Sequence, residues 1–363
     1  MHVLTDSPAT PPAAALEAVA TALAGGPAVA VLPEGPSTWR ARLGAAVRPD
    51  RDAAPGLVVP TSGSSGEPVG VLLSAEAVRW AAERTVERLG GPATWVLALP
   101  LTHVAGLMVL ARSVVSGTAA VRVTDDWAST LDRVDGRCCT AVVPTQLRRL
   151  LASSPAVLRR FDHVLVGGSA MDAELRRWAD AEGVSVVESY GMTETCGGCV
   201  HDGEPLPGVG VTLDDRGVVG IDGPMLADGY RRPGGDESLT RPFRTHDVGE
   251  WADGRLRVLG RVDDVVMSGG VTVPLPAVDA LLLQHPQVLD AAAVGVPDPE
   301  WGTRVVAVVV ADGPLDPDAI RSFVAARAER AYVPRAVVLV EDLLRPAPGK
   351  INRAALAALV PEV

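Results

Sequence analysis

The sequence predicts an α/β protein with a large N-terminal domain of mainly parallel sheets, a β subdomain and a small α+β C-terminal domain. Three observations support this class. Between residues 57 and about 211, short β-branched runs alternate with helical stretches, as in parallel-sheet domains. From Val209 the pattern changes to closely spaced hairpins. After Gly260, helices and apolar strands mix over about a hundred residues, a common domain size.

The first fifty residues, rich in Ala, Pro and Gly, contain one helix pattern from Pro12 to Leu23, followed by a strand-like run at 28–32. In the parallel-sheet region, the β-branched runs are 57–59, 95–99, 119–123, 140–143, 163–166 and 184–187, and the helical stretches include 75–89, 146–151 and 172–181. Ligands of such sheets bind in the loops at strand ends, so the loops that follow these runs are the expected site.

The β subdomain is predicted from two hairpins, one at 209–221 that turns at 214–217 and one at 249–259 that turns at Asp253-Gly254. The C-terminal part is predicted to contain a helix at 276–284, strands at 291–296 and 304–310, a helix at 316–331 and a strand at 336–340. We therefore expect one domain over residues 1–260 and a second over 264–363, with the junction at 261–264.

The composition, 47% hydrophobic and 21% charged, excludes a disordered chain and a collagen-like fibre. A net charge of −11 argues against nucleic-acid binding, because no surplus positive charge displaces counterions. No signal peptide is recognisable, and the most apolar stretch, 95–115, is broken by Pro100, His103 and Arg112. We expect a soluble, cytoplasmic protein with small ligands and no membrane insertion.

The cysteines, Cys138, Cys139, Cys196 and Cys199, are too few for a disulfide framework in a chain of 363 residues. Cys196 and Cys199 form a C-x-x-C with His201 two residues on, which fits half of a zinc or redox site. A structural zinc usually needs four ligands. Reduced thiols in a glycine-rich loop are therefore the favoured interpretation.

A serine- and glycine-rich loop follows the first strand of the α/β region and precedes the helix at 75–89. Its members are Thr61, Ser62, Gly63, Ser64, Ser65 and Gly66. Glycines let the backbone approach a phosphate, and the hydroxyls donate further hydrogen bonds. The lysine-containing motif of P-loop nucleotide triphosphatases is absent. A flexible connection is the alternative interpretation.

Three polar residues, Tyr190, Thr193 and Glu194, come soon after the run 184–187 and therefore lie at a strand end. Tyr190 offers an aromatic face to a base, Thr193 a hydroxyl to a phosphate, and Glu194 a carboxylate oxygen to Mg²⁺. For Thr193 and Glu194, a capped helix start is the alternative.

The hairpin that turns at Asp253-Gly254 brings two charged residues to the same end. Asp247 lies six residues before the turn and Arg261 seven after it, so antiparallel pairing places them close together. A carboxylate and a guanidinium at this place could hold a ribose diol or form a structural salt bridge, and the geometry favours neither.

Five motifs resemble, in order and spacing, the signatures of the AMP-forming superfamily of acyl- and aryl-CoA synthetases, peptide-synthetase adenylation domains and luciferases. They are Thr-Ser-Gly-Ser-Ser-Gly-Glu-Pro at 61–68, Tyr-Gly-Met-Thr-Glu at 190–194, Phe-Arg-Thr-His-Asp at 243–247, Gly-Arg-Val-Asp-Asp at 260–264 and Gly-Lys at 349–350. Within the superfamily, residues 99–106, 167–170 and 189–196 resemble the o-succinylbenzoate-CoA ligases of menaquinone biosynthesis.

The resemblance implies a two-step reaction that uses ATP, CoA and Mg²⁺. The carboxylate of o-succinylbenzoate attacks the α-phosphate to give an acyl-adenylate and pyrophosphate, and the CoA thiol then displaces AMP to give o-succinylbenzoyl-CoA. The resemblance also implies that residues 1–260 bind ATP and the acyl substrate, and that residues 264–363 form a mobile lid. Asp263 matches the hinge about which the lid rotates between the half-reactions.

The resemblance also assigns the nucleotide contacts. The loop 61–66 would hold the β- and γ-phosphates, Thr193 the α-phosphate, Glu194 the Mg²⁺, and Asp247 with Arg261 the ribose. The AMP-binding set further contains Gly168, Ser169, Ala170, Ser189, Tyr190, Gly191 and Met192.

For the acyl group and CoA, the resemblance implies a second set of residues. His103 and Gly167 would line the acyl pocket, and Lys350 would reach the α-phosphate and carboxylate oxygens during adenylation. The expected contacts on the pantetheine side of CoA are Ser268, Gly269 and Gly270.

Arg112 bears on the substrate because it interrupts the apolar helix pattern at 104–115. An unpaired buried guanidinium there would cost about 3–5 kcal/mol, so it needs an anion. In the resembling ligases, an arginine at this place meets the substrate carboxylate that is not activated. The alternative is that Arg112 reaches solvent or pairs with an internal acid.

Three features depart from the family pattern. Val69 stands where a lysine is usual, so stabilisation of the departing pyrophosphate would rest on Mg²⁺ and the loop N–H groups. Lys350 is the only lysine among the 33 lysine and arginine residues. His246 replaces the usual glycine before Asp247. Because the phosphate loop already begins at residue 61, we expect the first sheet to be shorter than is usual in the superfamily. A homodimer that used this part of the first sheet would lose contacts, so the sequence leaves homodimer formation open.

Two other functions are alternatives. One is an adenylating ligase for another aryl or acyl carboxylate, delivered to CoA or to a carrier-protein thiol. The other, suggested by Val69 and the short N-terminal region, is a degenerate member that binds its ligands without turnover.

Overall fold

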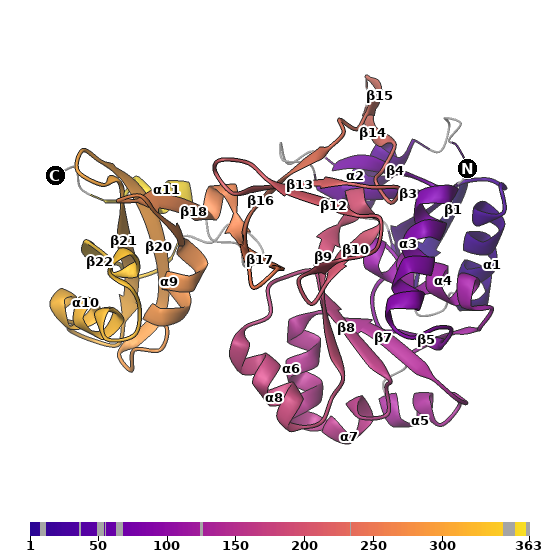
Figure 1. The fold of residues 1–363 in the computed structure, drawn as a ribbon, viewed down its shortest axis with the longest axis horizontal. Helices are drawn as coiled ribbons and strands as arrows, with labels where there is room; N and C mark the ends of the chain where they lie inside the picture. The colour runs from indigo at the N-terminus through magenta and orange to yellow at the C-terminus, as the bar shows by residue number, and fades with distance from the viewer. Residues whose placement is uncertain are drawn as a thin grey trace. The chain divides into compact units, whose positions relative to one another are not determined.

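The computed structural model describes residues 1–7, 12–35, 38–48, 54, 56–62, 68–123, 126–232, 234–343 and 353–360. The chain divides into two compact units, whose elements are labelled in Figure 1. Unit 1 comprises Met1–Thr212, Gly220–Arg244 and Ala252–Leu256, and unit 2 comprises Leu213–Val219, Thr245–Trp251 and Arg257–Val363.

The first sheet of unit 1 has six strands, three of them parallel. Their order is β1 (His2–Asp6), β2 (Val29–Pro33), β3 (Gly56–Ser62), β4 (Pro68–Ser74), β14 (Gly229–Arg232) and β15 (Gly235–Ser238). β1, β2 and β3 run parallel, whereas β4, β14 and β15 add antiparallel pairings. α1 (Pro12–Leu23) has the predicted bounds, and α2 (Thr38–Val47), β1 and β4 were not predicted.

The second sheet of unit 1 is the predicted parallel sheet, extended by an antiparallel edge. Its order is β11 (Glu204–Pro205), β10 (Gly197–His201), β9 (Val186–Met192), β8 (His163–Gly167), β7 (Cys138–Val142), β5 (Thr94–Leu97) and β6 (Ala120–Arg122). The strands from β9 to β6 are parallel, and β10 returns antiparallel to β9. A 3₁₀ turn, Thr193–Thr195, separates β9 from β10.

Helices cover both faces of this second sheet. They are α3 (Ala75–Arg88), α4 (Val104–Ser116), α5 (Trp127–Leu131), α6 (Pro144–Ser153), α7 (Pro155–Leu158) and α8 (Ala173–Ala181). α1 and α3 contact strands of both sheets, and α4 packs against α1, α3 and the second sheet, so these three helices lie between the sheets. On the other face, α6 and α8 enclose a core that includes Leu147, Val164 and Leu175.

The hairpin region forms a four-stranded sheet in the order β12 (Gly210–Leu213), β13 (Val218–Asp222), β16 (Phe243–Ala252) and β17 (Arg255–Arg261). The predicted turn is confirmed. Asp253 and Gly254 both have positive φ, +51° and +76°, which is the conformation of a two-residue type I′ turn.

Unit 2 contains a five-stranded sheet built from β18 (Val265–Ser268), β19 (Val271–Pro274), β20 (Val288–Asp298), β21 (Gly302–Ala311) and β22 (Ala336–Leu339). Its helices are α9 (Leu275–Leu282), α10 (Pro317–Ala325) and α11 (Arg353–Ala357), with 3₁₀ turns at Val262–Asp264 and Arg330–Tyr332. Alternate residues of β20 face two cores, with Ala291 and Ala293 on one side and Ala292 and Val294 on the other.

One predicted helix of unit 2 is too long. The pattern at 316–331 gives a helix that ends at Ala325, followed by the turn Arg330–Tyr332. Val333 is extended, with ψ of 119°, because the residue before Pro334 is disfavoured in helical backbone. In the described ranges of the chain, every helix is too short or too polar to span a bilayer.

Candidate active site

Two segments of expected AMP-binding residues, 168–170 and 189–192, lie where the pairing of β8 with β9 ends. Gly167 pairs with Ser189 across these parallel strands, after which residues 168–170 leave the sheet, whereas residues 190–192 continue β9 and pair with β10 alone. A Cβ on Gly167 would lie 2.5 Å from the Ser189 carbonyl oxygen, so this contact requires glycine. The strand-end placement predicted from the sequence is therefore present for Thr193 and Glu194, which lie in the turn after β9, whereas Tyr190 lies within the strand because β9 continues to pair with β10.

Glu194 lies in the turn after β9 and is held by a residue that the sequence did not single out. The Tyr230 hydroxyl donates a hydrogen bond of 3.0 Å to Glu194 Oε1. Tyr230 belongs to β14 and pairs with Val71 of β4 in the first sheet. A residue of the first sheet therefore orients the Glu194 carboxylate, which lies in the turn between β9 and β10 of the second sheet. Burial, with the Glu194 charge, raises the pKa of Tyr230, which keeps its hydroxyl protonated and able to donate.

The capping interpretation applies to Thr195 rather than to Thr193 or Glu194. Thr195 Oγ1 accepts a hydrogen bond from Met192 N at 2.9 Å and donates to the Gly197 carbonyl at 2.6 Å. Within the described part of the chain, the Thr193 hydroxyl makes no hydrogen bond. Thr193 and one carboxylate oxygen of Glu194 are thus available to a ligand.

The family resemblance implies that Glu194 holds Mg²⁺ during adenylation. On that expectation, Tyr230→Phe should raise the Mg²⁺ concentration for half-maximal adenylation about ten- to hundredfold, because groups that orient a metal ligand contribute this much to metal affinity. ATP–pyrophosphate exchange at varied Mg²⁺ measures the effect. Tyr332→Phe is the control, since it makes the same change in the turn Arg330–Tyr332 of unit 2. An unchanged Mg²⁺ requirement in Tyr230→Phe would contradict the orienting role.

His103 is the N-cap residue of α4, and its exposed side chain makes no capping hydrogen bond. The helix begins close against the preceding segment, because a Cβ on Gly106 would lie 2.2 Å from the Pro100 carbonyl oxygen. The imidazole of His103 is therefore presented beyond the end of β5, where ligands of parallel sheets bind.

Arg112, nine residues further along α4, is a buried cation with 4% of its surface exposed. Its Cζ lies 5.0 Å from the centroid of the Trp95 ring, and its Nε has no hydrogen-bond partner among the described residues. Burial lowers its pKa to about 10, opposed only by a smaller contribution from Cys139, so the guanidinium stays charged at neutral pH. Both alternatives from the sequence, exposure to solvent and pairing with an acid of the described chain, are excluded.

Several expected site residues lie outside the described residues. These are Gly63, Ser64, Ser65 and Gly66 of the phosphate loop, and Lys350. Thr61 and Ser62 are the last two residues of β3, Thr61 pairs with Val69 of β4, and Val69 is 5% exposed. The position of the usual lysine is therefore an apolar, buried position in this chain.

Asp247 and Arg261 belong to unit 2, on β16 and β17. The ion pair between Glu250 and Arg257, 3.3 Å long, lies directly across the hairpin and fixes its register. This register, continued from the two-residue turn, sets Asp247 opposite Gly260, next to Arg261. The predicted proximity of Asp247 and Arg261 along the hairpin is therefore supported, and Arg261 is exposed.

The remaining candidates of unit 2 lie in turns. Asp263 is exposed in the 3₁₀ turn Val262–Asp264. Ser268 is buried at the end of β18, and Gly269 and Gly270 form the turn to β19 with φ of +58° and +80°. A Cβ on Gly269 would lie 2.6 Å from the Trp301 ring, so the turn is closely packed.

Cys196 and Cys199 are buried thiols. Burial raises the pKa of both, that of Cys199 to about 12, so they stay protonated at neutral pH. No cluster of three or more His, Cys, Asp or Glu side chains suited to a metal occurs in the ranges that the structure describes.

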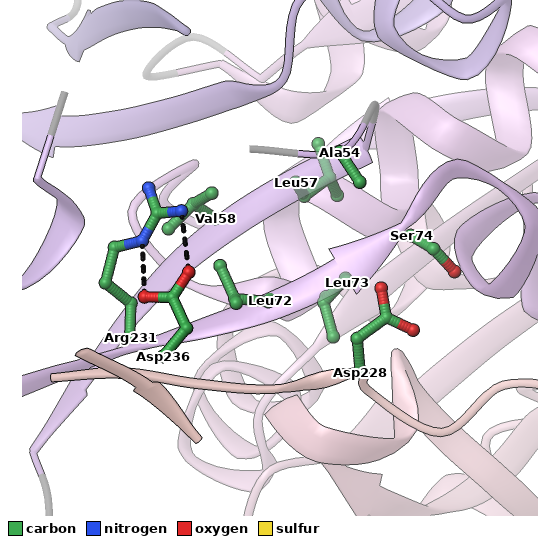
Figure 2. Close-up of a pocket in the computed structure, with 9 residues that line it drawn as sticks. All are labelled: Ala54, Leu57, Val58, Leu72, Leu73, Ser74, Asp228, Arg231 and Asp236. Atoms are coloured by element: carbon green, nitrogen blue, oxygen red, sulfur yellow. Dashed lines mark hydrogen bonds and ion pairs between the residues drawn. The ribbon is translucent and has the colours of Figure 1, made fainter. Parts of the chain in front are cut away.

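A pocket in the first sheet is separate from the expected substrate residues. Figure 2 shows it between β3, β4 and β14, with Arg231 and Asp236 joined by two hydrogen bonds of 3.2 and 3.1 Å on one side and Asp228 with Ser74 on the other. Burial raises the pKa of Asp228. None of the residues expected to contact substrate lines it.

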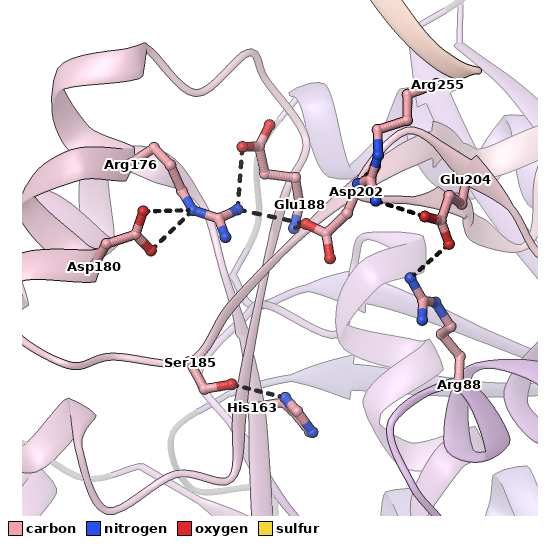
Figure 3. A network of polar contacts seen from close by, with 9 residues as sticks. All are labelled: Arg88, His163, Arg176, Asp180, Ser185, Glu188, Asp202, Glu204 and Arg255. Atoms are coloured by element: carbon pink, nitrogen blue, oxygen red, sulfur yellow. Dashed lines mark hydrogen bonds and ion pairs between the residues drawn. The ribbon is translucent and has the colours of Figure 1, made fainter. Parts of the chain in front are cut away.

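A network of ion pairs supports β9 and β10 from outside (Figure 3). Arg176 of α8 reaches Asp180, Glu188 and Asp202 at 3.1, 3.4 and 3.5 Å. Arg255 donates to the Asp202 carbonyl at 2.7 Å, which fixes the turn after β10. Exposed pairs contribute little stability singly, so their role here is to hold the strand ends that carry Ser189 and Tyr190.

Comparison with known proteins agrees with this arrangement. Residues 8–228 match the AMP-binding enzyme family, and residues 277–350 match the AMP-binding enzyme C-terminal domain. A probable 2-succinylbenzoate--CoA ligase of Mycobacterium tuberculosis is 40% identical over 325 residues, covering 85% of this chain and 84% of that protein. The 2-succinylbenzoate--CoA ligase of Bacillus licheniformis is 31% identical over 326 residues, covering 81% and 68%.

Solved structures have the same fold. The o-succinylbenzoate CoA synthetase of Bacillus subtilis in complex with its acyl-adenylate intermediate aligns with a TM-score of 0.74 at 22% identity, covering 98% of this chain and 87% of that one. The Bacillus subtilis enzyme in complex with ATP and magnesium aligns with a TM-score of 0.69 at 26% identity, covering 83% and 69%. The chain therefore belongs to the AMP-binding enzyme family.

Proposed function

We propose that the chain is an AMP-forming ligase that joins o-succinylbenzoate to CoA with cleavage of ATP. Membership of the AMP-binding enzyme family supports the adenylation chemistry, and relatives at 40% and 31% identity that carry the name of this ligase support the substrate. Within the chain, Arg112 carries the assignment, because it is a buried guanidinium for which the described residues offer no carboxylate.

The reaction has two half-reactions. In the first, a carboxylate oxygen of the substrate attacks the α-phosphorus of ATP, the bond from that phosphorus to the bridging oxygen breaks, and pyrophosphate leaves. In the second, the CoA sulfur, after losing its proton, attacks the acyl carbon, and the bond from that carbon to the AMP oxygen breaks.

Different residues are proposed to bind the metal ion, the phosphates, the adenine and the ribose. Glu194 would hold Mg²⁺ through its carboxylate, which Tyr230 keeps in place, and Mg²⁺ when bound offsets the negative charge of the phosphates. The Thr193 hydroxyl donates to the α-phosphate, and Tyr190 stacks on the adenine. In the same proposal Asp247 and Arg261 hold the ribose.

The acyl substrate carries two carboxylates, one of which reacts. In the proposal His103 faces the reacting end, beyond the end of β5, and Arg112 binds the other carboxylate. A carboxylate brought to a buried, unpaired guanidinium forms a charge-assisted hydrogen bond in surroundings of low dielectric constant, where such bonds are strong. Substrates with a single carboxylate leave Arg112 unpaired and are expected to bind more weakly.

Arg112→Met is expected to raise KM for o-succinylbenzoate at least about thirtyfold, because removing one partner of a buried charge pair costs about 2 kcal/mol or more. The KM for ATP should not change. The free energy of unfolding of the ligand-free variant should not fall, since methionine of similar length replaces an unpaired buried cation. Steady-state kinetics and denaturant unfolding measure these quantities.

ATP–pyrophosphate exchange with a panel of carboxylic acids tests the proposal as a whole. We expect o-succinylbenzoate to support exchange best, followed by single-carboxylate analogues. Exchange with a monocarboxylate but not with o-succinylbenzoate would overturn the substrate assignment and the role of Arg112 while keeping the adenylation chemistry. Absence of exchange with every acid would favour a binder without turnover.

A further inference from the structure

His201 is a buried polar side chain that the fold leaves without a partner. It ends β10, opposite Ser189 of β9, and none of its surface is exposed. Neither ring nitrogen has a hydrogen-bond partner among the described residues. A neutral imidazole carries one donor and one acceptor, and leaving both unpaired in the interior costs stability. Such a group calls for a partner that the described residues do not provide.

The unpaired imidazole lies in the same region of unit 1 as the unpaired guanidinium of Arg112. α4, which carries Arg112, packs against β10, and so does α3, which carries Arg88. Burial, together with the charges of Arg112 and Arg88, lowers the pKa of His201 to about 3, so the ring is neutral and one nitrogen is a donor. No Asp or Glu of the described chain appears among the charges that act on either Arg112 or His201.

Glycine at position 198 lets the Ser189 hydroxyl and the His201 ring lie close to the backbone of β10. A Cβ on Gly198 would lie 1.9 Å from Ser189 Oγ and 3.3 Å from His201 Nε2, so the Ser189 hydroxyl occupies the place that a side chain at position 198 would need. The pairing of β10 with β9 shifts register between Gly198 and Val200, which turns the end of the strand. His201 Nε2 therefore lies near the Ser189 hydroxyl, at the start of the expected AMP-binding segment 189–192.

We propose that His201 is a specificity-determining residue whose ring N–H, together with Arg112, binds the substrate carboxylate that is not activated. This inference rests on the proposed function. A carboxylate accepts several hydrogen bonds through its two oxygens, so it can satisfy a guanidinium and an imidazole at once. One carboxylate would thus accept hydrogen bonds from both groups, which accounts for two buried polar side chains that have no partner among the described residues.

The test compares His201→Leu, which removes both nitrogens, with His201→Gln, which keeps an N–H donor. His201→Leu is expected to raise KM for o-succinylbenzoate about ten- to hundredfold, the effect of losing a hydrogen bond to a charged group, with KM for ATP unchanged. His201→Gln should restore at least part of the affinity. His163→Leu is the matched control, because the ring of His163 bonds to Ser185 at 2.9 Å at the start of β8.

A second measurement separates binding of the carboxylate from a structural role. In this proposal the carboxylate that is not activated is the one on the benzene ring. With 4-oxo-4-phenylbutanoate, which lacks that ring carboxylate and keeps the other, His201→Leu and wild type should have the same KM. An equal loss with both acids, or an unchanged KM for o-succinylbenzoate in His201→Leu, would overturn the role of His201 and leave the proposed function standing. If wild type shows no exchange with o-succinylbenzoate, the proposed function and this inference both fall.

Should His201→Leu fail to fold, His201→Phe, which also removes both nitrogens, decides the question. Its KM for o-succinylbenzoate should rise relative to wild type, and its KM for 4-oxo-4-phenylbutanoate should not. An unchanged KM for o-succinylbenzoate in a folded His201→Phe variant would contradict the inference.

Discussion

Replacing Lys350 by alanine is expected to slow o-succinylbenzoate-dependent ATP–pyrophosphate exchange about a hundred- to thousandfold, the effect of removing one group that stabilises charge in the transition state. Lys350 is the only lysine in a chain with 33 basic residues, so arginine serves at every other basic position. A compact ammonium on a flexible stem can reach between two reacting groups where a planar guanidinium cannot. Val69, buried where relatives of this superfamily usually have a lysine, leaves no second ammonium for the phosphates.

Two controls show where the effect arises. Lys350→Arg keeps the charge but changes its shape, and we expect it to be nearly as slow as Lys350→Ala. Thioester formation from added acyl-adenylate and CoA, which bypasses adenylation, should stay close to the wild-type rate in both variants. Exchange at the wild-type rate in Lys350→Ala would show that this lysine has no part in adenylation.

The parts of the fold that local sequence patterns encode were predicted well. The helix Pro12–Leu23 was predicted with its observed bounds, because its buried residues recur along one helical face. The turn Asp253-Gly254 was predicted because the pair tolerates the positive φ of a two-residue hairpin turn. From that turn alone, Asp247 and Arg261 could be placed at the same end.

The contacts that the sequence could not provide join residues far apart in the chain. Tyr230 reaches Glu194 because β14 adds to the first sheet beside β4, and no local pattern predicts that pairing. His201 stood out in the sequence only as a neighbour of the C-x-x-C pair. Its unpaired nitrogens became evident once β10, α3 and α4 were seen to bury it.

In unit 2, Arg353→Ala is expected to lower the free energy of unfolding by about 3–5 kcal/mol, because it leaves a buried carboxylate without its counterion. Arg353 begins α11 and donates from Nε to Asp264 Oδ1 at 2.8 Å, from Nη2 to Asp279 Oδ2 at 2.7 Å, and from Nη1 to the Ala293 carbonyl at 2.6 Å. The side chains of Arg353 and Asp279 are each 11% exposed. One arginine thus joins α11 to α9, β20 and the turn Val262–Asp264.

The pH dependence of the stability lost in Arg353→Ala shows whether the unpaired Asp279 carboxylate causes that loss. Burial raises the pKa of Asp279, and Arg353 opposes that rise. A carboxyl with a higher pKa in the folded state costs stability once the pH exceeds its ordinary pKa near 4, and removing Arg353 increases this cost. The loss of stability should therefore be largest near pH 7 and shrink as the pH falls toward 4.

Hydrogen exchange of peptides from β20 and β21 in the full chain measures the opening of unit 2 separately from unit 1. Arg257→Ala is the control within unit 2, because its pair with Glu250 is exposed and should change stability by less than about 1 kcal/mol. The double variant Arg353→Leu/Asp279→Leu removes the carboxylate together with its counterion, and replacing both members of a buried pair by apolar side chains is often close to neutral. We therefore expect it to regain most of the protection that Arg353→Ala loses. A double variant as unprotected as the single one would mean that the loss comes from the packing of α11 on the sheet, and not from an uncompensated charge at Asp279.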